Sequence, residues 1–215
     1  MRSVKQAAVG FRVHSGWAAA VAVCVEKGVP VVLARQRVQL VEIFTYEFRQ
    51  PYHTAERMLA GQAREFISRM KVEARRLAYR AVRELESRTL EQGVRLTRCG
   101  LLLASGRPLP ALEKILASHA LIHTADGELF REAILHASAR CGLRDFRIKD
   151  KELLDRAGQV FRAKPNELMC RVTELGRSLG TPWSQDEKFA TLAAWLALAA
   201  PPQSSSKERE KSAPT

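Results

Sequence analysis

The chain has 215 residues, of which 46% are apolar and 27% charged, so the composition excludes a disordered or fibrous protein and fits one globular core. No apolar run is long enough to cross a membrane, and no signal-peptide block follows the N-terminus, so we expect a cytoplasmic protein with no membrane partner. The formal net charge is +12, and residues 1–100 hold 18 lysines and arginines against 9 acidic residues. This surplus favours nucleic acid or ribosomal RNA as a partner, with a solubilising surface as the other interpretation.

The first 43 residues predict three consecutive antiparallel strands joined by tight turns. Apolar and β-branched residues, partly alternating with polar ones, fill the ranges 7–13, 17–25 and 29–43. The two breaks between these ranges carry Gly16 and Gly28, the residue type that tight turns favour. We therefore expect two successive hairpins at the start of the fold.

The rest of the chain predicts helices that alternate with short strands. Thr54 can cap a long helix over residues 54–92, whose basic face is either solvated or turned toward phosphates. Buried strands are predicted over 99–104 and near 146–148. Further helices are predicted over 110–117 and 128–140, either joined or broken near 124–127, and a helical region over 151–179 with a helix start at Pro165. A last helix is predicted between the capping box of Ser184 and Glu187 and Pro201.

The composition changes at the end of the chain. Residues 201–215 are rich in Ser, Lys, Glu and Pro and poor in large apolar side chains. Such a segment cannot bury enough apolar surface to offset the entropy of ordering it. We expect one domain over residues 1–200, followed by a disordered tail.

The predicted element order, β-β-β-α-β-α-β-α, is that of the ribonuclease H-like fold, an α/β fold with a mixed sheet and helices on its faces. Val9-Gly10-Phe11, with the glycine turn before Trp17, resembles the opening hairpin of RuvC-like Holliday-junction resolvases. The segment 185–193, which includes Asp186, resembles their last helix, which is rich in Asp, Ala and Leu. The chain is therefore similar to this superfamily over most of residues 5–199.

This resemblance implies a nuclease that holds two divalent cations with carboxylates on the first strand, at the end of the fourth strand and on the last helix. In this chain Arg12 stands at the first-strand position, and the fourth strand ends at Leu103-Ala104-Ser105. On the last helix Phe189 replaces one acid and Asp186 matches the other, although an aspartate there also complements the helix dipole. Most catalytic carboxylates are thus lost, and we expect no cofactor, with Mg²⁺ or Mn²⁺ needed only by a remaining nuclease.

The same resemblance implies that several side chains meet at one end of the sheet. They are Arg12, His14, Ser105, Arg107 and Asp186. Two interpretations remain open for them. They form either an arginine-lined cleft that binds phosphate without a metal, or an ion pair between Arg12 and Asp186 that fills the vacated metal site.

Two further segments carry candidate site residues. Between Phe48 and Arg57, aromatic and basic side chains alternate, as binding of single-stranded nucleic acid requires, and the alternative is that this loop caps the core. The residues concerned are Arg49, Tyr52, His53 and Arg57. His119 and His123 share a helical face and could hold a divalent metal, with Asp126 as the third ligand if the helix breaks there. The alternative is that Asp126 caps a helix start, which is the more common role of an aspartate at such a position.

We predict a non-catalytic ribonuclease H-like domain that binds nucleic acid or the ribosome. One alternative is a protein-interaction module or homodimer that uses the long helix 54–92. The other is a divergent metal-dependent nuclease in which Glu42, Asp126, Asp150 or Asp155 supplies the missing carboxylates. Enzyme activity is expected only under that last alternative.

Overall fold

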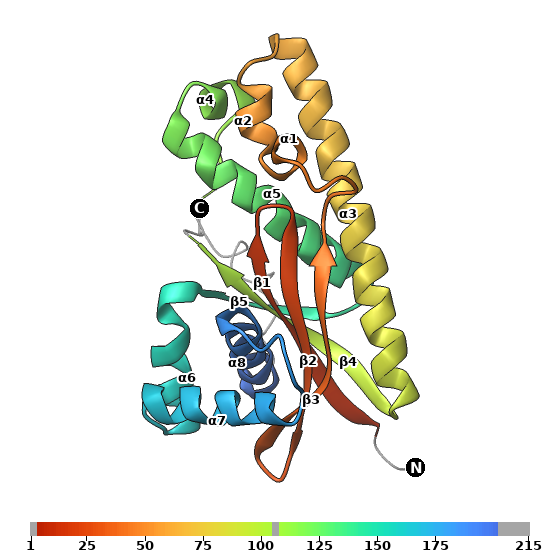
Figure 1. Cartoon of the computed structure of the whole chain (residues 1–215), viewed down its shortest axis with the longest axis vertical. Helices are drawn as coiled ribbons and strands as arrows, with labels where there is room; N and C mark the ends of the chain where they lie inside the picture. The colour runs from red at the N-terminus through yellow and green to blue at the C-terminus, as the bar shows by residue number, and fades with distance from the viewer. Residues whose placement is uncertain (1–3, 105–107, 202–215) are drawn as a thin grey trace, which may run out of the picture.

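The computed structural model describes residues 4–104 and 108–201, and a five-stranded mixed sheet lies at its centre (Figure 1). The strands are β1 Lys5–His14, β2 Trp17–Glu26, β3 Val29–Gln39, β4 Val94–Leu103 and β5 Arg144–Lys149. They lie in the order β3-β2-β1-β4-β5. The first three pair antiparallel, whereas β4 lies parallel to β1 and β5 parallel to β4. The three predicted antiparallel strands and the two later strands are confirmed.

Helices cover both faces of this sheet (Figure 1). They are α1 Tyr46–Arg49, α2 Pro51–Ala55, α3 Ala60–Glu91, α4 Leu112–Leu116, α5 His119–Arg140, α6 Leu153–Phe161, α7 Pro165–Arg177 and α8 Gln185–Ala199, with a 3-10 turn at Asp150–Glu152. α3 and α5 pack together on one face, and α8 lies on the other with α6 and α7 beside it. In the described part of the chain, no helix has the length and apolar character needed to cross a membrane.

The alternation of side chains along β1 explains the two layers. Val9 and Phe11 point into the larger core, which α3 and α5 complete. Ala8 points to the opposite face, where it meets Ala190 and Ala194 of α8. Because successive side chains of a strand point to opposite faces, a strand that is apolar on both faces needs a helix layer on each. β1 is such a strand, and it is the central one.

The turns between the first strands follow the prediction. Gly16 has a φ of +82° and Gly28 a φ of +81°, in the left-handed region that glycine adopts at little cost. The capping box of the last helix is also present, since the backbone N–H of Ser184 donates to Oε2 of Glu187 at 2.8 Å. Asp186 donates its own N–H to Oγ of Ser184 at 3.1 Å.

The predicted helix 54–92 is wrong at its start. Thr54 lies inside α2, and its hydroxyl donates to the carbonyl oxygens of Glu47 and Gln50 at 2.9 and 3.2 Å instead of capping α3. α3 begins only at Ala60, after Leu59 in an extended conformation. The hydrogen bonds of the Thr54 side chain therefore lie within the short α1–α2 segment. The sequence pattern did not separate this segment from the long helix that follows it.

The structure defines two other helical ranges more closely, and the predicted helix start at Pro165 is confirmed. α5 runs without a break from His119 through Asp126 and Gly127, so the helix extends nine residues before the predicted start at residue 128. The range 151–179 divides into α6 and α7, because Arg162 takes a left-handed conformation with a φ of +49° before Pro165. A left-handed residue followed by proline ends one helix and begins the next.

α8 approaches the sheet at two glycines that face each other in register. Gly10 of β1 pairs with Gly100 of β4. A Cβ added to Gly10 would lie 1.8 Å from the carbonyl oxygen of Ala190, and one added to Gly100 would lie 2.3 Å from that of Ala193. The helix backbone therefore rests directly on the strand backbones, and only glycine permits this approach.

We predict that Gly10→Ala lowers the free energy of unfolding by about 3 kcal/mol or more, the upper end of the cost of overpacking, because the helix backbone must move. Chemical denaturation of the purified variant measures this change. Gly61→Ala is the matched control, since Gly61 lies in α3 with no atom within 4 Å of an added Cβ. The control should leave stability unchanged or raise it by up to about 1 kcal/mol. Equal effects of the two substitutions would contradict the close approach of α8.

Candidate functional site

Arg12 forms two ion pairs at the end of the sheet. Its Nε lies 3.1 Å from Oδ2 of Asp150, and its Nη1 lies 3.1 Å from Oδ1 of Asp186. The side chains of Arg12 and Asp186 are each 21% exposed, so they are shielded from solvent more than a surface ion pair. The ion pair that the sequence offered as one of two interpretations is therefore present, with Asp150 added. Ser105 and Arg107, which were expected beside it, lie outside the described residues.

His14 completes this cluster, which we call the sheet-end group: Arg12, His14, Asp150 and Asp186. Nε2 of His14 lies 2.9 Å from Oδ1 of Asp186, and its ring stacks on that of Trp17 with the centroids 4.4 Å apart. Two carboxylates surround the single guanidinium of Arg12. The group therefore has no surplus of positive charge, and Arg12 is not free to bind a phosphate.

The resemblance to nucleases implies two divalent cations at this end of the sheet, and the residues present do not fit them. Hard cations need several anionic oxygen ligands. The guanidinium of Arg12 lies between the two aspartates, and a guanidinium has donors but no acceptor with which to bind a cation. β4 ends at Leu103 without an acid, and the ring of Phe189 lies against Arg12, 4.7 Å from its Cζ to the ring centroid. A ligand set for two cations is thus missing here among the described residues.

The carboxylates considered as substitutes lie in different parts of the molecule. Glu42 pairs with an arginine of α3, and Asp126 is buried between α2 and α5. Asp155 lines a surface pocket on α6. Of these four acids, Asp150 is the one that reaches the sheet-end group, and it does so through Arg12. The structure does not assemble the others into one metal site.

A row of alternating arginines and aromatic rings extends from His14 across the start of β2 and the end of β3. We call it the arginine–aromatic ladder: Trp17, Arg37, Phe44 and Arg49. Cζ of Arg37 lies 3.9 Å from the ring centroid of Trp17 and 5.4 Å from that of Phe44. Cζ of Arg49 lies 4.6 Å from the centroid of Phe44. These distances are those of cation–π contacts, so the rings hold both guanidinium groups in place. Arg37 and Phe44 are exposed, and Trp17 and Arg49 are partly buried.

The ladder and α3 differ in how their positive charge is compensated. Five arginines of α3 form ion pairs with glutamates: Arg64, Arg75, Arg76, Arg83 and Arg88. Within residues 4–104 and 108–201, neither Arg37 nor Arg49 has a carboxylate at ion-pair distance. Most arginines of α3 are therefore ion-paired, with Arg69 and Arg80 as exceptions, which favours the solvated interpretation. Both arginines of the ladder keep their charge uncompensated among the described residues.

The other side chains expected to contact a single strand lie in two different settings. Tyr52 is 3% exposed, and burial raises the pKa of its phenol to about 12, so its ring is not available to stack on a base. The side chain of His53 is 10% exposed and faces α5. Arg57 lies exposed in the turn after α2. This part of the loop caps the core, which was the alternative interpretation.

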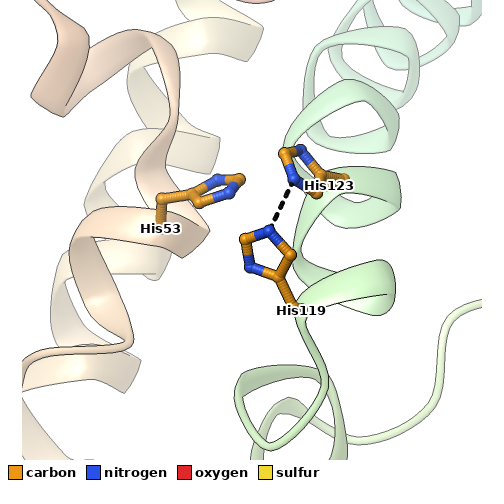
Figure 2. A group of neighbouring side chains, drawn as sticks. All are labelled: His53, His119 and His123. Atoms are coloured by element: carbon orange, nitrogen blue, oxygen red, sulfur yellow. Dashed lines mark hydrogen bonds between the residues drawn. The ribbon is translucent and has the colours of Figure 1, made fainter.

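A second polar cluster joins α2 to the start of α5 (Figure 2). His53, His119 and His123 each offer one ring nitrogen, and these three atoms lie within 4.8 Å of one another. Asp126, expected as a ligand, instead lies 2.5 Å through Oδ2 from Nδ1 of His53, and its Oδ1 accepts the backbone N–H of Tyr52 at 2.7 Å. Burial raises the pKa of the Asp126 carboxyl, and these two hydrogen bonds oppose that shift. His53 therefore takes the place that the sequence gave to Asp126.

Comparison with known proteins bears on the fold. No family model and no curated protein matches the chain. Among solved structures, it is similar to Thermus thermophilus RuvC, with 12% identity and a TM-score of 0.52 over 90% of this chain and 93% of that chain. T. thermophilus RuvC in complex with Holliday junction substrate gives 10% identity with the same TM-score and coverage. The chain therefore has the predicted ribonuclease H-like α/β fold.

Three residues of the ladder were not predicted as site residues: Trp17, Arg37 and Phe44. The strand register contained the signal, because Trp17 pairs with Gln39, and Arg37 is two residues away on the same face of β3. A tryptophan after a tight turn, opposite a strand with alternating arginines, predicts a cation–π contact once the pairing is known. The contact with Phe44 comes from the irregular segment after β3, which periodicity does not describe.

We predict that Arg12→Asp converts the sheet-end group into a cation site. Without added metal, three neighbouring carboxylates repel one another, so stability should fall by about 1–3 kcal/mol. Millimolar Mn²⁺ should then raise the melting temperature of this variant, because the cation binds only the folded state. Thermal melts with and without Mn²⁺ measure the effect. Arg12→Asn is the control with a smaller rise, and an equal rise in the unsubstituted protein would contradict the role given to Arg12.

Proposed function

We propose that this protein is a non-catalytic ribonuclease H-like domain that binds nucleic acid through the arginine–aromatic ladder. The observation that carries the proposal is the pair Arg37 and Arg49, which aromatic rings hold in place without a carboxylate partner among the described residues. In an ion pair, the carboxylate compensates the charge of the arginine and already accepts hydrogen bonds from its guanidinium N–H groups. An arginine held by a ring keeps most of its N–H groups free for phosphate oxygens.

The geometry of the ladder suits a nucleic-acid backbone. Arg37 lies between the rings of Trp17 and Phe44, and Arg49 contacts the same Phe44 ring. Nε of Arg49 donates to the carbonyl oxygen of Ser15 at 3.4 Å, which leaves its terminal nitrogens for a ligand. Guanidinium groups and aromatic rings are the two components of surfaces that bind single strands without strong sequence preference. The net charge of +12 would raise the local concentration of such a ligand.

The fold supports the same class of ligand. T. thermophilus RuvC, a similar structure, is known in complex with a Holliday junction substrate. The sheet-end group argues against cleavage, because Arg12 is paired with both nearby aspartates where that chemistry needs carboxylates that bind cations. Binding without cleavage is the function that accounts for both the ladder and the sheet-end group.

We predict that the double substitution Arg37→Ala/Arg49→Ala weakens binding to nucleic acid by about tenfold to a hundredfold at moderate salt. Loss of two phosphate contacts should also reduce the slope of log K against log salt by about 1.4–1.8. Fluorescence titrations against single-stranded DNA, duplex DNA, branched DNA and structured RNA at several salt concentrations measure both quantities. The four ligands distinguish between DNA and RNA as the partner.

The matched control is Arg83→Ala/Arg88→Ala, which removes the same formal charge from arginines that pair with glutamates on α3. It should change affinity by less than about threefold, since these cations are already compensated. Equal losses in the two double variants would mean that net charge, not the ladder, drives binding. Absence of salt-sensitive binding to any of the four ligands would favour a protein-interaction module instead. Cleavage products formed with Mn²⁺ would overturn the non-catalytic part of the proposal.

A further inference from the structure

We propose that His53, His119 and His123 form a binding site for a zinc-class transition-metal dication, with a solvent-facing fourth position and Asp126 as the residue that orients His53. The site lies between α2 and the first turns of α5 (Figure 2). It uses none of the residues of the arginine–aromatic ladder. The inference is therefore independent of the proposed binding of nucleic acid.

The spacing of the nitrogens matches the geometry of such a site. His119 and His123 are four residues apart on one helix, so their side chains project from the same face. Their Nε2 atoms are 3.0 Å apart, and one nitrogen from each of the three rings lies within 4.8 Å of the others. With Zn–N bonds of about 2.0–2.1 Å, tetrahedral ligands are separated by about 3.4 Å. The nitrogens of His119 and His123 already lie within a few tenths of an ångström of that distance.

The three imidazoles point toward one another from α2 and α5 (Figure 2). The ring centroid of His53 lies 4.4 Å from that of His123 and 5.5 Å from that of His119. The N–H of one of the rings of His119 and His123 can donate to the lone pair of the other. The lone pair of the His53 ring then has no donor within the cluster. A dication satisfies all three lone pairs at once. Hydrogen bonds among the three rings alone cannot do this.

Asp126 supplies the outer-shell contact that metal-bound histidines usually make. It is 3% exposed, and it accepts from Nδ1 of His53 and from the backbone N–H of Tyr52. A carboxylate at Nδ1 keeps the proton on that nitrogen and leaves the lone pair of Nε2 free. The orientation of His53 is therefore fixed before any metal binds, and less entropy is lost on binding.

The donor set indicates which metals would bind. Three imidazoles without a direct carboxylate or thiolate ligand suit Zn²⁺, Co²⁺, Ni²⁺ and Cu²⁺, whereas Mg²⁺ and Ca²⁺ need oxygen ligands. His119 and His123 are exposed, so a fourth position would be open to water. Three protein ligands plus water is the open arrangement, in contrast to the four protein ligands of closed structural zinc sites. The ligands of this site are therefore nitrogen atoms, whereas a nuclease site at the sheet end would bind its two cations through carboxylate oxygens.

The test is titration of the full chain with Co²⁺, followed by displacement with Zn²⁺ against a chromophoric chelator. We expect one cobalt ion per chain, with the visible absorption of a four-coordinate Co²⁺ centre. His119→Ala should weaken Zn²⁺ binding at least a hundredfold, and His123→Ala should do the same. Because both side chains are exposed, these variants should fold, which circular dichroism would verify.

Two further variants make the test specific. His136→Gln removes a histidine of α5 outside the cluster and should bind Zn²⁺ like the unsubstituted protein. Asp126→Asn should weaken binding by about tenfold to a hundredfold, the usual effect of losing an outer-shell carboxylate. Zn²⁺ should raise the melting temperature of the unsubstituted protein and of His136→Gln, but not of His119→Ala. Failure to bind either metal at micromolar concentration, or unchanged binding by His119→Ala, would overturn the proposal.

Discussion

The contact of α8 with Gly10 and Gly100 is the constraint on which the candidate sites at the sheet end depend. Two backbones approach there without side chains between them, so the helix cannot slide or rotate without a steric clash. This fixed position carries Asp186, in the first turn of α8, to the end of β1, where Arg12 and His14 meet it. Gly10, which forms part of the family motif in the sequence, is therefore required by the close packing of α8 on β1. It sets the distance between the central strand and the helix that completes the site.

The fixed distance also decides what the sheet-end group can do. In a nuclease with this fold, carboxylates from strand and helix would meet at this place, and cations would balance their charge. Here a guanidinium balances it, and it does so from within the fold, because Arg12 is tied to Asp150 as well as to Asp186. The same end of the molecule still presents positive charge, but it lies on Arg37 and Arg49, which the rings of the ladder hold apart from any described carboxylate.

The sequence was informative where the relevant interactions are local, and less so where they are long-range. Strand alternation, the turn at Gly16 and the capping box at Ser184 involve neighbours in the chain, and all three are confirmed. The pairing of Arg12 with Asp150 joins β1 to the turn after β5, and no pattern in either segment reports it. For His53 the sequence left two interpretations open, a contact with nucleic acid or part of a core cap, and it did not predict the contact with α5, because those partners come from another helix. Local patterns gave the fold, whereas the chemistry of both sites depends on residues brought together by packing.

A buried carboxylate links the two exposed surfaces of the molecule. Asp126 on α5 holds the α1–α2 segment by accepting the N–H of Tyr52 and the imidazole of His53. Gln50 is both the C-cap of α1 and the N-cap of α2, so the two short helices meet at this residue. Arg49 is the residue before that junction, and its place in the ladder depends on the segment being held. The histidine cluster and the ladder therefore share no residues, but both depend on the contacts that Asp126 makes with α2. Helices as short as α1 and α2 are not stable alone, so tertiary contacts keep them ordered.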